Sequence, residues 1–251
     1  MSRHRSALFL DIDGTLIDIA ATPQSVIVPD ALPALLYGLS SRLDGALALV
    51  SGRPVAQIDA LMAPLALPCA GGHGAQLRLV AGGPLTDIDE HKGGSGDGRF
   101  ELPIELVSAL ASLAAHDARL LLEHKPHSMA IHFRAAPELA GPLRDKLDQL
   151  LLRHPQVEIL AGKMIYELKR PGFDKGRAIV RLMRDSPFDS RLPVMIGDDI
   201  TDEAAFAAVL RLGGEFFSVG RDLPGAAGIF DDPRAVRLAL ADVLGRAIST
   251  H

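Results

Sequence analysis

Cysteine is scarce in this sequence of 251 residues, where Cys69 is the single cysteine. That scarcity excludes a disulfide framework and a metal site built from cysteines, and it fits a reducing, cytoplasmic setting. Long apolar runs are missing too, because no uncharged apolar stretch approaches the roughly 20 residues that a membrane span requires. The amino terminus, MSRHRSALFLD, has only five weakly apolar residues before Asp11, which is too few for a signal peptide. We therefore expect a soluble, cytoplasmic protein without an export signal.

An excess of basic residues is also lacking, because the formal net charge is −5 and both signs are interspersed along the chain. Proteins that bind nucleic acids usually carry a basic patch or stripe, so we expect no nucleic acid as a partner. The lack of a long apolar run likewise leads us to expect no membrane as a partner. With 48% hydrophobic residues, the chain can bury a substantial core as one large domain or two modest ones. The glycine-rich stretch GGSGDG at residues 93–98 is interpreted as a flexible loop, and the sequence does not indicate an oligomeric state.

Short apolar segments alternate with longer segments of helical periodicity near both ends of the chain. The apolar segments lack polar alternation, which is typical of strands buried on both faces of a parallel sheet. We predict an α/β fold with a Rossmann-like parallel sheet covered by helices, and we expect Asp30 to cap the first helix and Pro54 to open the second. Strands are expected at 7–12, 45–52, 193–199 and 215–220, and helices at 30–43, 54–65, 174–185, 201–213 and 232–248.

The middle of the chain departs from this alternation. Between about residues 77 and 166 the pattern predicts a strand, a glycine-rich loop, a helix, two strands, a second helix and two more strands. The stretch LLLEHKPHSMAIHFRAAP, residues 120–137, has two apolar runs with a polar break, as in an antiparallel pair. We predict a core formed by residues 1–80 and 169–251, with residues 81–168 inserted as a smaller α+β cap domain.

Three of the predicted parallel strands end in polar residues, in the stretches LDIDGT, LVSGR and MIGDD. Ligands bind beyond the carboxyl ends of strands in open parallel sheets, and these three ends would meet at one edge. Carboxylates gathered there repel one another unless a cation lies between them, and hard oxygen ligands suit Mg²⁺. The residues brought together would be Asp11, Asp13, Ser51, Asp198, Asp199 and Asp202.

Each of these stretches taken alone has a simpler interpretation. A single D-x-D usually forms a turn or a helix cap, SGR carries almost no information, and GDD resembles a turn after which Thr201 or Asp202 would cap a helix. Their occurrence together, in this order and each at the end of an apolar strand, favours a shared site. Glycines at positions 14, 52 and 197 allow a ligand to approach the backbone closely.

As a set, DIDGT, the serine of VSGR, a lysine and GDDITDE resemble the four motifs of the haloacid dehalogenase-like phosphatases. The resemblance implies that Asp11 is the nucleophile, which attacks the substrate phosphorus and forms an aspartyl-phosphate. Asp13 would protonate the leaving sugar oxygen and then deprotonate water, and two residues at i and i+2 of an extended segment share a side. Mg²⁺ would be held by Asp11, the backbone carbonyl of Asp13 and Asp198, with Asp199 and Asp202 close by.

The same resemblance implies side chains that bind the phosphate. Ser51 matches the second motif, and either Lys169 or Lys175 would supply the lysine, with the position just before Gly176 favouring Lys175. The simpler alternative for Lys175 is a solvated lysine in the first turn of a helix. Further substrate contacts are expected from Gly14, Thr15, Gly52 and Arg53.

Several stretches resemble one family of this superfamily, the trehalose-6-phosphate phosphatases: DGALALVSGR, LPCAGGHGAQLR, EHKPHSMAIHFR, YELKRPGFDKG and GDDITDE. This resemblance implies a Mg²⁺-dependent phosphatase that converts trehalose 6-phosphate to trehalose and phosphate, the last step of trehalose biosynthesis, with a cap that closes over the cleft and reads the sugar. Gln76 departs from the glutamate expected in many relatives, which puts the contribution of its loop in doubt. The candidates for sugar binding are His73, Gly74, Glu123, Lys125, His132, Arg134 and Glu167.

Alternatives exist for these residues and for the function. Glu123 and Lys125 would otherwise be an exposed ion pair of little energetic value, His132 and Arg134 solvated strand residues, and His73 a buried loop histidine. The functional alternatives are a phosphatase for sucrose 6-phosphate or mannosyl-3-phosphoglycerate, a sugar phosphomutase, and a non-catalytic sensor of sugar phosphates.

Overall fold

A computed structural model describes residues 6–20, 22, 25–87, 102–125 and 128–245. The chain divides into two compact units, the large unit (Met1–Glu90 with Asp174–His251) and the small unit (His91–Phe173). The division falls 10 residues later at the first crossing and 5 residues later at the second than the boundaries expected from the sequence, 80/81 and 168/169. The glycine-rich stretch at residues 93–98, expected to be a loop, lies outside the described residues.

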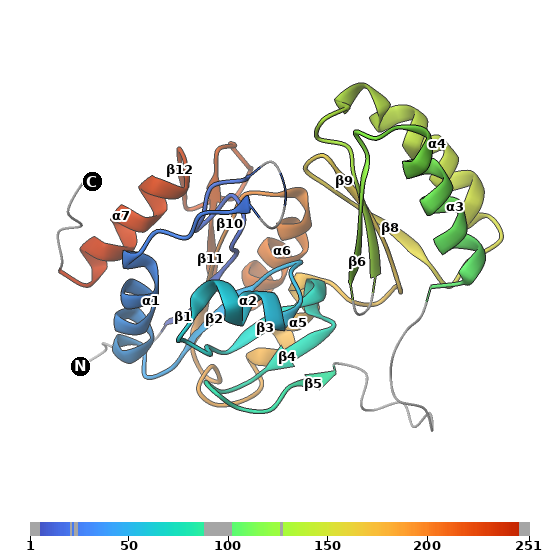
Figure 1. Ribbon diagram of the computed structural model, residues 1–251. Helices are drawn as coiled ribbons and strands as arrows, with labels where there is room; N and C mark the ends of the chain where they lie inside the picture. Colours follow the sequence, from blue (N-terminus) through green and yellow to red (C-terminus); the bar gives the residue numbers. More distant parts are fainter. Residues whose placement is uncertain (1–5, 21, 23–24, 88–101, 126–127, 246–251) are drawn as a thin grey trace. The chain divides into compact units, whose positions relative to one another are not determined.

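The large unit is built on one sheet with the strand order β12-β11-β10-β1-β2-β3-β4-β5 (Figure 1). Neighbouring strands from β12 to β3 run parallel, and β4 and β5 extend the sheet antiparallel at its edge. The predicted parallel sheet is therefore confirmed, whereas the strand expected near residue 77 is β4 and joins this sheet. The strands are β1 (Ser6–Leu10), β2 (Leu47–Val50), β3 (Cys69–Gly71), β4 (Gln76–Arg78), β5 (Thr86–Asp87), β10 (Leu192–Gly197), β11 (Glu215–Val219) and β12 (Gly228–Phe230).

Helices cover both faces of this sheet. Leu8 and Leu10 of β1 pack in a core with α1, α2 and α7, while Ala7 and Phe9 pack in a second core with α5 and α6. Because alternate residues of a strand point to opposite faces, burial on both faces explains why β1 is apolar throughout. Among the described residues, no helix is long and apolar enough to cross a membrane. The helices are α1 (Ala31–Arg42), α2 (Val55–Met62), α5 (Lys175–Leu182), α6 (Glu203–Arg211) and α7 (Pro233–Val243).

Two helix starts differ from the expectation. Asp30 is the N-cap residue of α1, but its side chain forms no capping hydrogen bond. Its backbone is already helical (φ −55°, ψ −32°), whereas a capping side chain normally hydrogen-bonds from an extended backbone, as Asp174 does at α5. Pro54 directly precedes α2 as its N-cap and lies outside the first turn.

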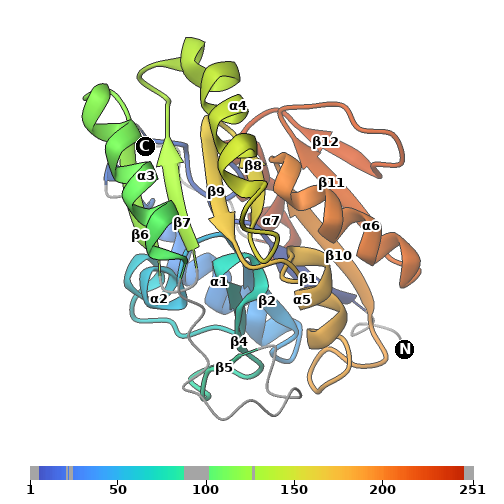
Figure 2. The same cartoon turned by 90° about the vertical axis from the view of Figure 1, so that its right-hand side faces the viewer.

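The small unit has an antiparallel sheet with the strand order β6-β7-β9-β8, and two helices cover one face of it (Figure 2). The antiparallel pair expected within residues 120–137 is β6 with β7. Met129 and Ile131 of β7 pack against the helices in a separate apolar core, so the alternate residues Ser128, Ala130 and His132 point to the opposite face. The elements are α3 (Ile104–His116), β6 (Leu121–Lys125), β7 (Ser128–His132), α4 (Ala140–Leu151), β8 (Glu158–Gly162) and β9 (Ile165–Lys169).

Candidate active site

Three neighbouring strand ends of the large sheet carry the polar residues singled out in the sequence. Strands β10, β1 and β2 are adjacent and parallel, so their carboxyl ends lie at the same edge. Asp11 and Asp13 follow β1, Ser51 follows β2, and Asp198 follows β10. The structure thus brings together residues that are up to 187 positions apart in the chain.

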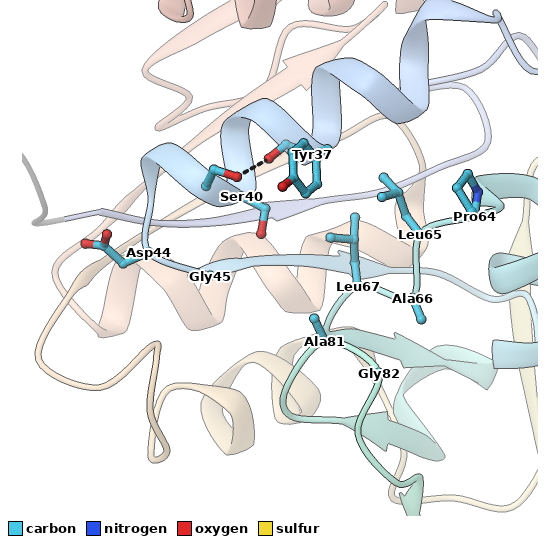
Figure 3. Close-up of a pocket in the computed structure, with 11 residues that line it drawn as sticks. Tyr37, Ser40, Asp44, Gly45, Pro64, Leu65, Ala66, Leu67, Ala81 and Gly82 are labelled. Atoms are coloured by element: carbon cyan, nitrogen blue, oxygen red, sulfur yellow. Dashed lines mark hydrogen bonds between the residues drawn. The ribbon is translucent and has the colours of Figure 1, made fainter.

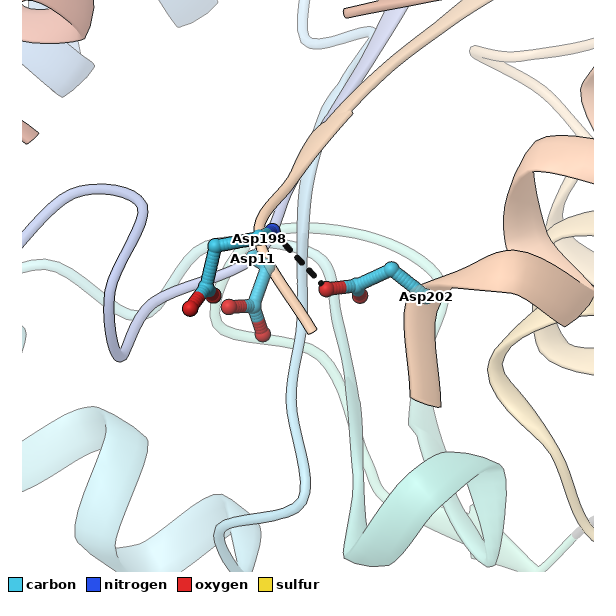
Figure 4. A group of neighbouring side chains, drawn as sticks. All are labelled: Asp11, Asp198 and Asp202. Atoms are coloured by element: carbon cyan, nitrogen blue, oxygen red, sulfur yellow. Dashed lines mark hydrogen bonds between the residues drawn. The ribbon is translucent and has the colours of Figure 1, made fainter. Parts of the chain in front are cut away.

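Three carboxylates form the centre of this edge (Figure 4). One oxygen each from Asp11, Asp198 and Asp202 lies within 4.8 Å of the others. Asp202 is held in place by the backbone, because the N–H groups of Asp198 and Asp199 donate to its Oδ2 at 3.1 and 3.0 Å. Asp13 and Asp199, also expected among the metal ligands, are not members of this cluster.

Asp199 has a different contact in the structure. Its side chain accepts a hydrogen bond from the backbone N–H of Ile200 at 2.7 Å and forms a capping box with Asp202 over the short 3₁₀ turn Ile200–Asp202. Arg221, which no sequence motif singled out, donates to the backbone oxygen of Asp199 at 2.6 Å and to Glu203 at 3.1 Å. Asp199 and Arg221 therefore shape the turn that carries Asp202.

Lys175 provides the positive charge beside the cluster. Its Nζ lies 2.7 Å from Oδ1 of Asp11 and 2.7 Å from Oδ1 of Asp202, and its side chain is only 3% exposed. Lys169 belongs to the small unit, where it pairs with Glu158 and donates to the carbonyl of Phe173. Of the two candidate lysines, Lys175 is therefore the one beside Asp11.

Burial governs the ionisation of this cluster. Burial raises the pKa of Asp11 well above its ordinary value; Lys175 opposes the rise, while Asp202 and Asp198 add to it. Burial disfavours the charged form of Lys175, but the two carboxylates outweigh it and raise the pKa of the ammonium group. A divalent cation would favour the ionised carboxylates, and three hard oxygen donors fit such an ion. The residues present are therefore compatible with a bound metal.

Two glycines leave room for the carboxylates. A Cβ atom on Gly14, whose φ is +86°, would lie 2.2 Å from Oδ2 of Asp198, and one on Gly197 would lie 2.5 Å from the carboxyl carbon of Asp202. Thr15 donates to Oδ1 of Asp198 at 3.3 Å. Gly14 and Thr15, expected to contact substrate, thus lie against a carboxylate of the cluster.

The loop after β2 packs against the loop that carries His73. The backbone N–H of His73 donates to the carbonyl of Ser51 at 3.0 Å, and a Cβ on Gly52 would lie 2.4 Å from the His73 ring. A Cβ on Gly74, whose φ is +101°, would lie 2.8 Å from the carbonyl of Asp174, so this loop also lies close to the start of α5.

Gln76 and Arg53 have well-defined contacts near these loops. The side-chain oxygen of Gln76 accepts a hydrogen bond from the first N–H of α2, at Val55, at 3.2 Å. The amide therefore performs a helix-capping contact that needs no negative charge. The guanidinium of Arg53 donates to both carboxylate oxygens of Asp13, each at 2.6 Å.

The small unit carries a polar network of its own. Glu123 lies 2.9 Å from His132, while Lys125 and Ser128 both donate to Glu167 at 2.5 Å. Burial opposes the charge of Glu123, but the hydrogen bond from His132 and the charge of Lys125 outweigh it and hold the pKa of Glu123 below its ordinary value. These residues are thus a partly buried network and not an exposed ion pair. Ser128 was missed because a serine after a polar break carries no signal until strand register pairs it with β9.

A pocket of about 470 Å³ lies elsewhere in the large unit (Figure 3). Tyr37 and Ser40 of α1 line it together with Asp44 and Gly45, which precede β2. The pocket is therefore near the amino end of β2, whereas the carboxylates lie beyond the carboxyl ends of the strands. None of the predicted site residues lines it.

The sequence is similar to those of known proteins. Residues 9–220 match the family described as Trehalose-phosphatase. A probable trehalose-phosphate phosphatase of Sinorhizobium fredii is 41% identical over 92% of this chain and 84% of its own length. The trehalose-6-phosphate phosphatase of Escherichia coli is 37% identical over 85% of this chain and 77% of its own length.

A solved structure agrees with the fold. The crystal structure of a trehalose-6-phosphate phosphatase related protein superposes with a TM-score of 0.75 and 26% sequence identity, covering 95% of this chain and 96% of that chain. The similarity therefore extends over both the large and the small unit, each of which lies mostly within the aligned length.

Proposed function

The chain belongs to the trehalose-phosphatase family, and we propose that it hydrolyses trehalose 6-phosphate to trehalose and inorganic phosphate, the last step of trehalose biosynthesis. It is a phosphatase with a haloacid dehalogenase-like fold. The observation that carries the proposal is the buried group of Asp11, Lys175, Asp198 and Asp202, which lies within the matched residues.

We assign the carboxylates of Asp11, Asp198 and Asp202 to a Mg²⁺ site, with the backbone carbonyl of Asp13 as a further ligand. When bound, Mg²⁺ would screen the negative nucleophile from the negative phosphate and polarise a phosphoryl oxygen. Asp199 would contribute through the capping of the turn that holds Asp202. Such a partner that orients a ligand commonly matters nearly as much to metal affinity as the ligand.

Asp11 and Asp13 divide the chemistry between them. A carboxylate oxygen of Asp11 attacks phosphorus, the bond from phosphorus to the sugar oxygen breaks, and Asp13 gives that oxygen its proton. Asp13 then takes a proton from water, whose oxygen attacks the phosphorus of the aspartyl-phosphate, releases phosphate and restores Asp11. The positions two residues apart support this division, because both follow the end of the same strand.

Lys175 and Ser51 act on the charges of the phosphate and the nucleophile. Lys175, 2.7 Å from Oδ1 of Asp11, holds the nucleophile and supplies positive charge for the phosphoryl group. The hydroxyl of Ser51 accepts a hydrogen bond from the backbone N–H of Arg53 at 3.1 Å, so its own proton can be donated to a phosphate oxygen.

We propose that the polar network of the small unit recognises the sugar by hydrogen bonds to its hydroxyl groups. Carboxylates such as Glu123 and Glu167 accept hydrogen bonds from sugar hydroxyls, and Lys125 and His132 can donate. Their mutual contacts, at 2.5 to 2.9 Å, preorganise these groups before a substrate arrives. His73, Gly74 and Arg134 remain further candidates, and a cytoplasmic location remains the expectation from the lone cysteine.

A substrate panel tests the proposal. Purified protein with Mg²⁺ should release phosphate from trehalose 6-phosphate with a higher kcat/KM than from sucrose 6-phosphate or mannosyl-3-phosphoglycerate. Asp11→Asn, which removes the attacking carboxylate, should lower that value by about 10³-fold or more. Preference for another sugar phosphate would refute the substrate, and isomerised sugar phosphate without free phosphate would indicate a mutase. Activity retained by Asp11→Asn would refute the aspartyl-phosphate route.

A further inference from the structure

The guanidinium of Arg53 hydrogen-bonds to both carboxylate oxygens of Asp13. Its Nε lies 2.6 Å from Oδ2 and its Nη2 lies 2.6 Å from Oδ1. A forked contact of this kind fixes the plane and direction of a carboxylate, which a single hydrogen bond does not. The side chain of Asp13 is 34% exposed, whereas that of Arg53 is only 10% exposed. The side chain of Arg53 is therefore the more deeply buried of the two.

Arg53 is itself held in place along its length. Its backbone N–H donates to the Ser51 hydroxyl at 3.1 Å, and its carbonyl accepts from the N–H of Gly72 at 2.9 Å. At the far end of the side chain, Nη1 lies 3.4 Å from the Gln57 side-chain oxygen on the first turn of α2. The loop after β2 thus holds the guanidinium in a fixed position beside Asp13, the third residue after β1.

We propose that Arg53 is a positioning residue that orients Asp13 for proton transfer, a role distinct from the substrate contact expected from the sequence. This inference rests on the proposed function of Asp13 as acid and base. The forked contact suits the ionised carboxylate, which takes the proton of water in the second half of the reaction. In the first half of the reaction, Asp13 becomes negatively charged as its proton passes to the sugar oxygen. The guanidinium of Arg53 then stabilises this charge.

The contact with Arg53 also restricts where Asp13 can carry its proton. A proton on the side of the carboxyl group that faces the guanidinium would displace one of the two hydrogen bonds, whereas a proton on the far side leaves both in place. The contact therefore favours a proton on the far side, where Asp13 can donate it to the leaving oxygen while Arg53 keeps the carboxyl group oriented. Because general acid catalysis contributes about 10²–10⁴-fold to a rate, a loss of orientation should be measurable.

The test compares two leaving groups in single turnovers. The sugar alkoxide of trehalose 6-phosphate needs a proton to leave, whereas the nitrophenolate of p-nitrophenyl phosphate is a weak base and needs almost none. Arg53→Ala should slow release of trehalose by about 10²-fold and release of nitrophenol by less than about threefold. Arg53→Lys, which keeps a charge but loses the fork, should fall between wild type and Arg53→Ala.

A double-mutant comparison separates orientation from phosphate binding. If Arg53 acts through Asp13, adding Arg53→Ala to Asp13→Asn should cause little further loss, because the two changes remove one function. Arg211→Ala, a change at an exposed arginine of the same unit, is the control and should leave both rates unchanged. Thermal unfolding of every variant separates lost catalysis from lost folding.

Three outcomes would overturn the inference. They are equal slowing with both substrates, no slowing with either, and an additive loss in the double mutant. If wild-type protein releases no phosphate from trehalose 6-phosphate, the proposed function fails on its own. The comparison of leaving groups is then made with the sugar phosphate that the substrate panel selects, so the role of Arg53 is decided in either case.

Discussion

Replacing Lys175 by methionine should destabilise the large unit strongly when no divalent cation is present. Lys175 Nζ lies 2.7 Å from one oxygen of Asp11 and 2.7 Å from one oxygen of Asp202, and the three side chains are 3%, 5% and 0% exposed. Methionine fills much of the same volume but leaves two buried carboxylates facing each other without a cation. Removal of one partner from such a buried group costs about 3–5 kcal/mol. For a unit of this size, that loss lowers the unfolding temperature by roughly 6–20 °C.

Thermal and urea unfolding with a chelator present measure this loss. The control is Lys146→Met on the exposed side of α4, which should change the free energy of unfolding by no more than about 0.5 kcal/mol. A loss below about 1 kcal/mol for Lys175→Met would refute the interpretation of Lys175 as the counter-ion of a buried carboxylate cluster.

Mg²⁺ provides a second measurement on the same variant. A cation bound by the carboxylates replaces part of the charge that the mutation removes, so Mg²⁺ should raise the unfolding temperature of Lys175→Met more than that of wild type. Equal shifts in the two proteins would contradict the assignment of the ion to the carboxylates beside Lys175. The measurement does not depend on catalytic activity.

Three further predictions concern other residues. Burial raises the pKa of the Cys69 thiol to about 12, so the native protein at pH 8 should react with a thiol-specific disulfide reagent only as fast as it unfolds, and rapid labelling of folded protein would contradict this. Arg221→Ala removes the hydrogen bond from the guanidinium to the carbonyl of Asp199 and should weaken Mg²⁺ binding by about 10-fold in a calorimetric titration; an unchanged affinity would argue against a role for Arg221. Gln76→Glu puts a negative charge at the start of α2 and should raise the free energy of unfolding in urea by about 0.3–1 kcal/mol, which a destabilised variant would refute.

The parallel core was predictable because its physical signal is strong. A strand such as β1 is buried on both faces, so the polar residues Asp11 and Asp13 directly after it stand out against an apolar run. The rule that parallel strands end at a common edge then places Ser51 and Asp198 near them. The apolar pattern and the topology of a parallel sheet are therefore enough to predict that these residues lie close together.

The hydrophobic pattern of the sequence does not predict contacts between individual side chains. The neighbours Asp198 and Asp199 look equivalent in the sequence, but successive residues of an extended segment point to opposite sides, and only Asp198 joins the cluster. The fork from Arg53 to Asp13 and the cap from Gln76 to α2 join segments that are 40 and 21 positions apart. Such pairs depend on loop conformations, which hydrophobic periodicity does not encode.

Trapping the covalent intermediate tests the central claim most directly. Wild-type protein is mixed with trehalose 6-phosphate labelled on phosphorus and quenched in acid within one turnover, and the labelled peptide is then mapped. We predict label on the peptide that contains Asp11, at the side chain of Asp11 itself, and no label in Asp11→Asn. Phosphate release without a covalent label, or label on another residue, would contradict it.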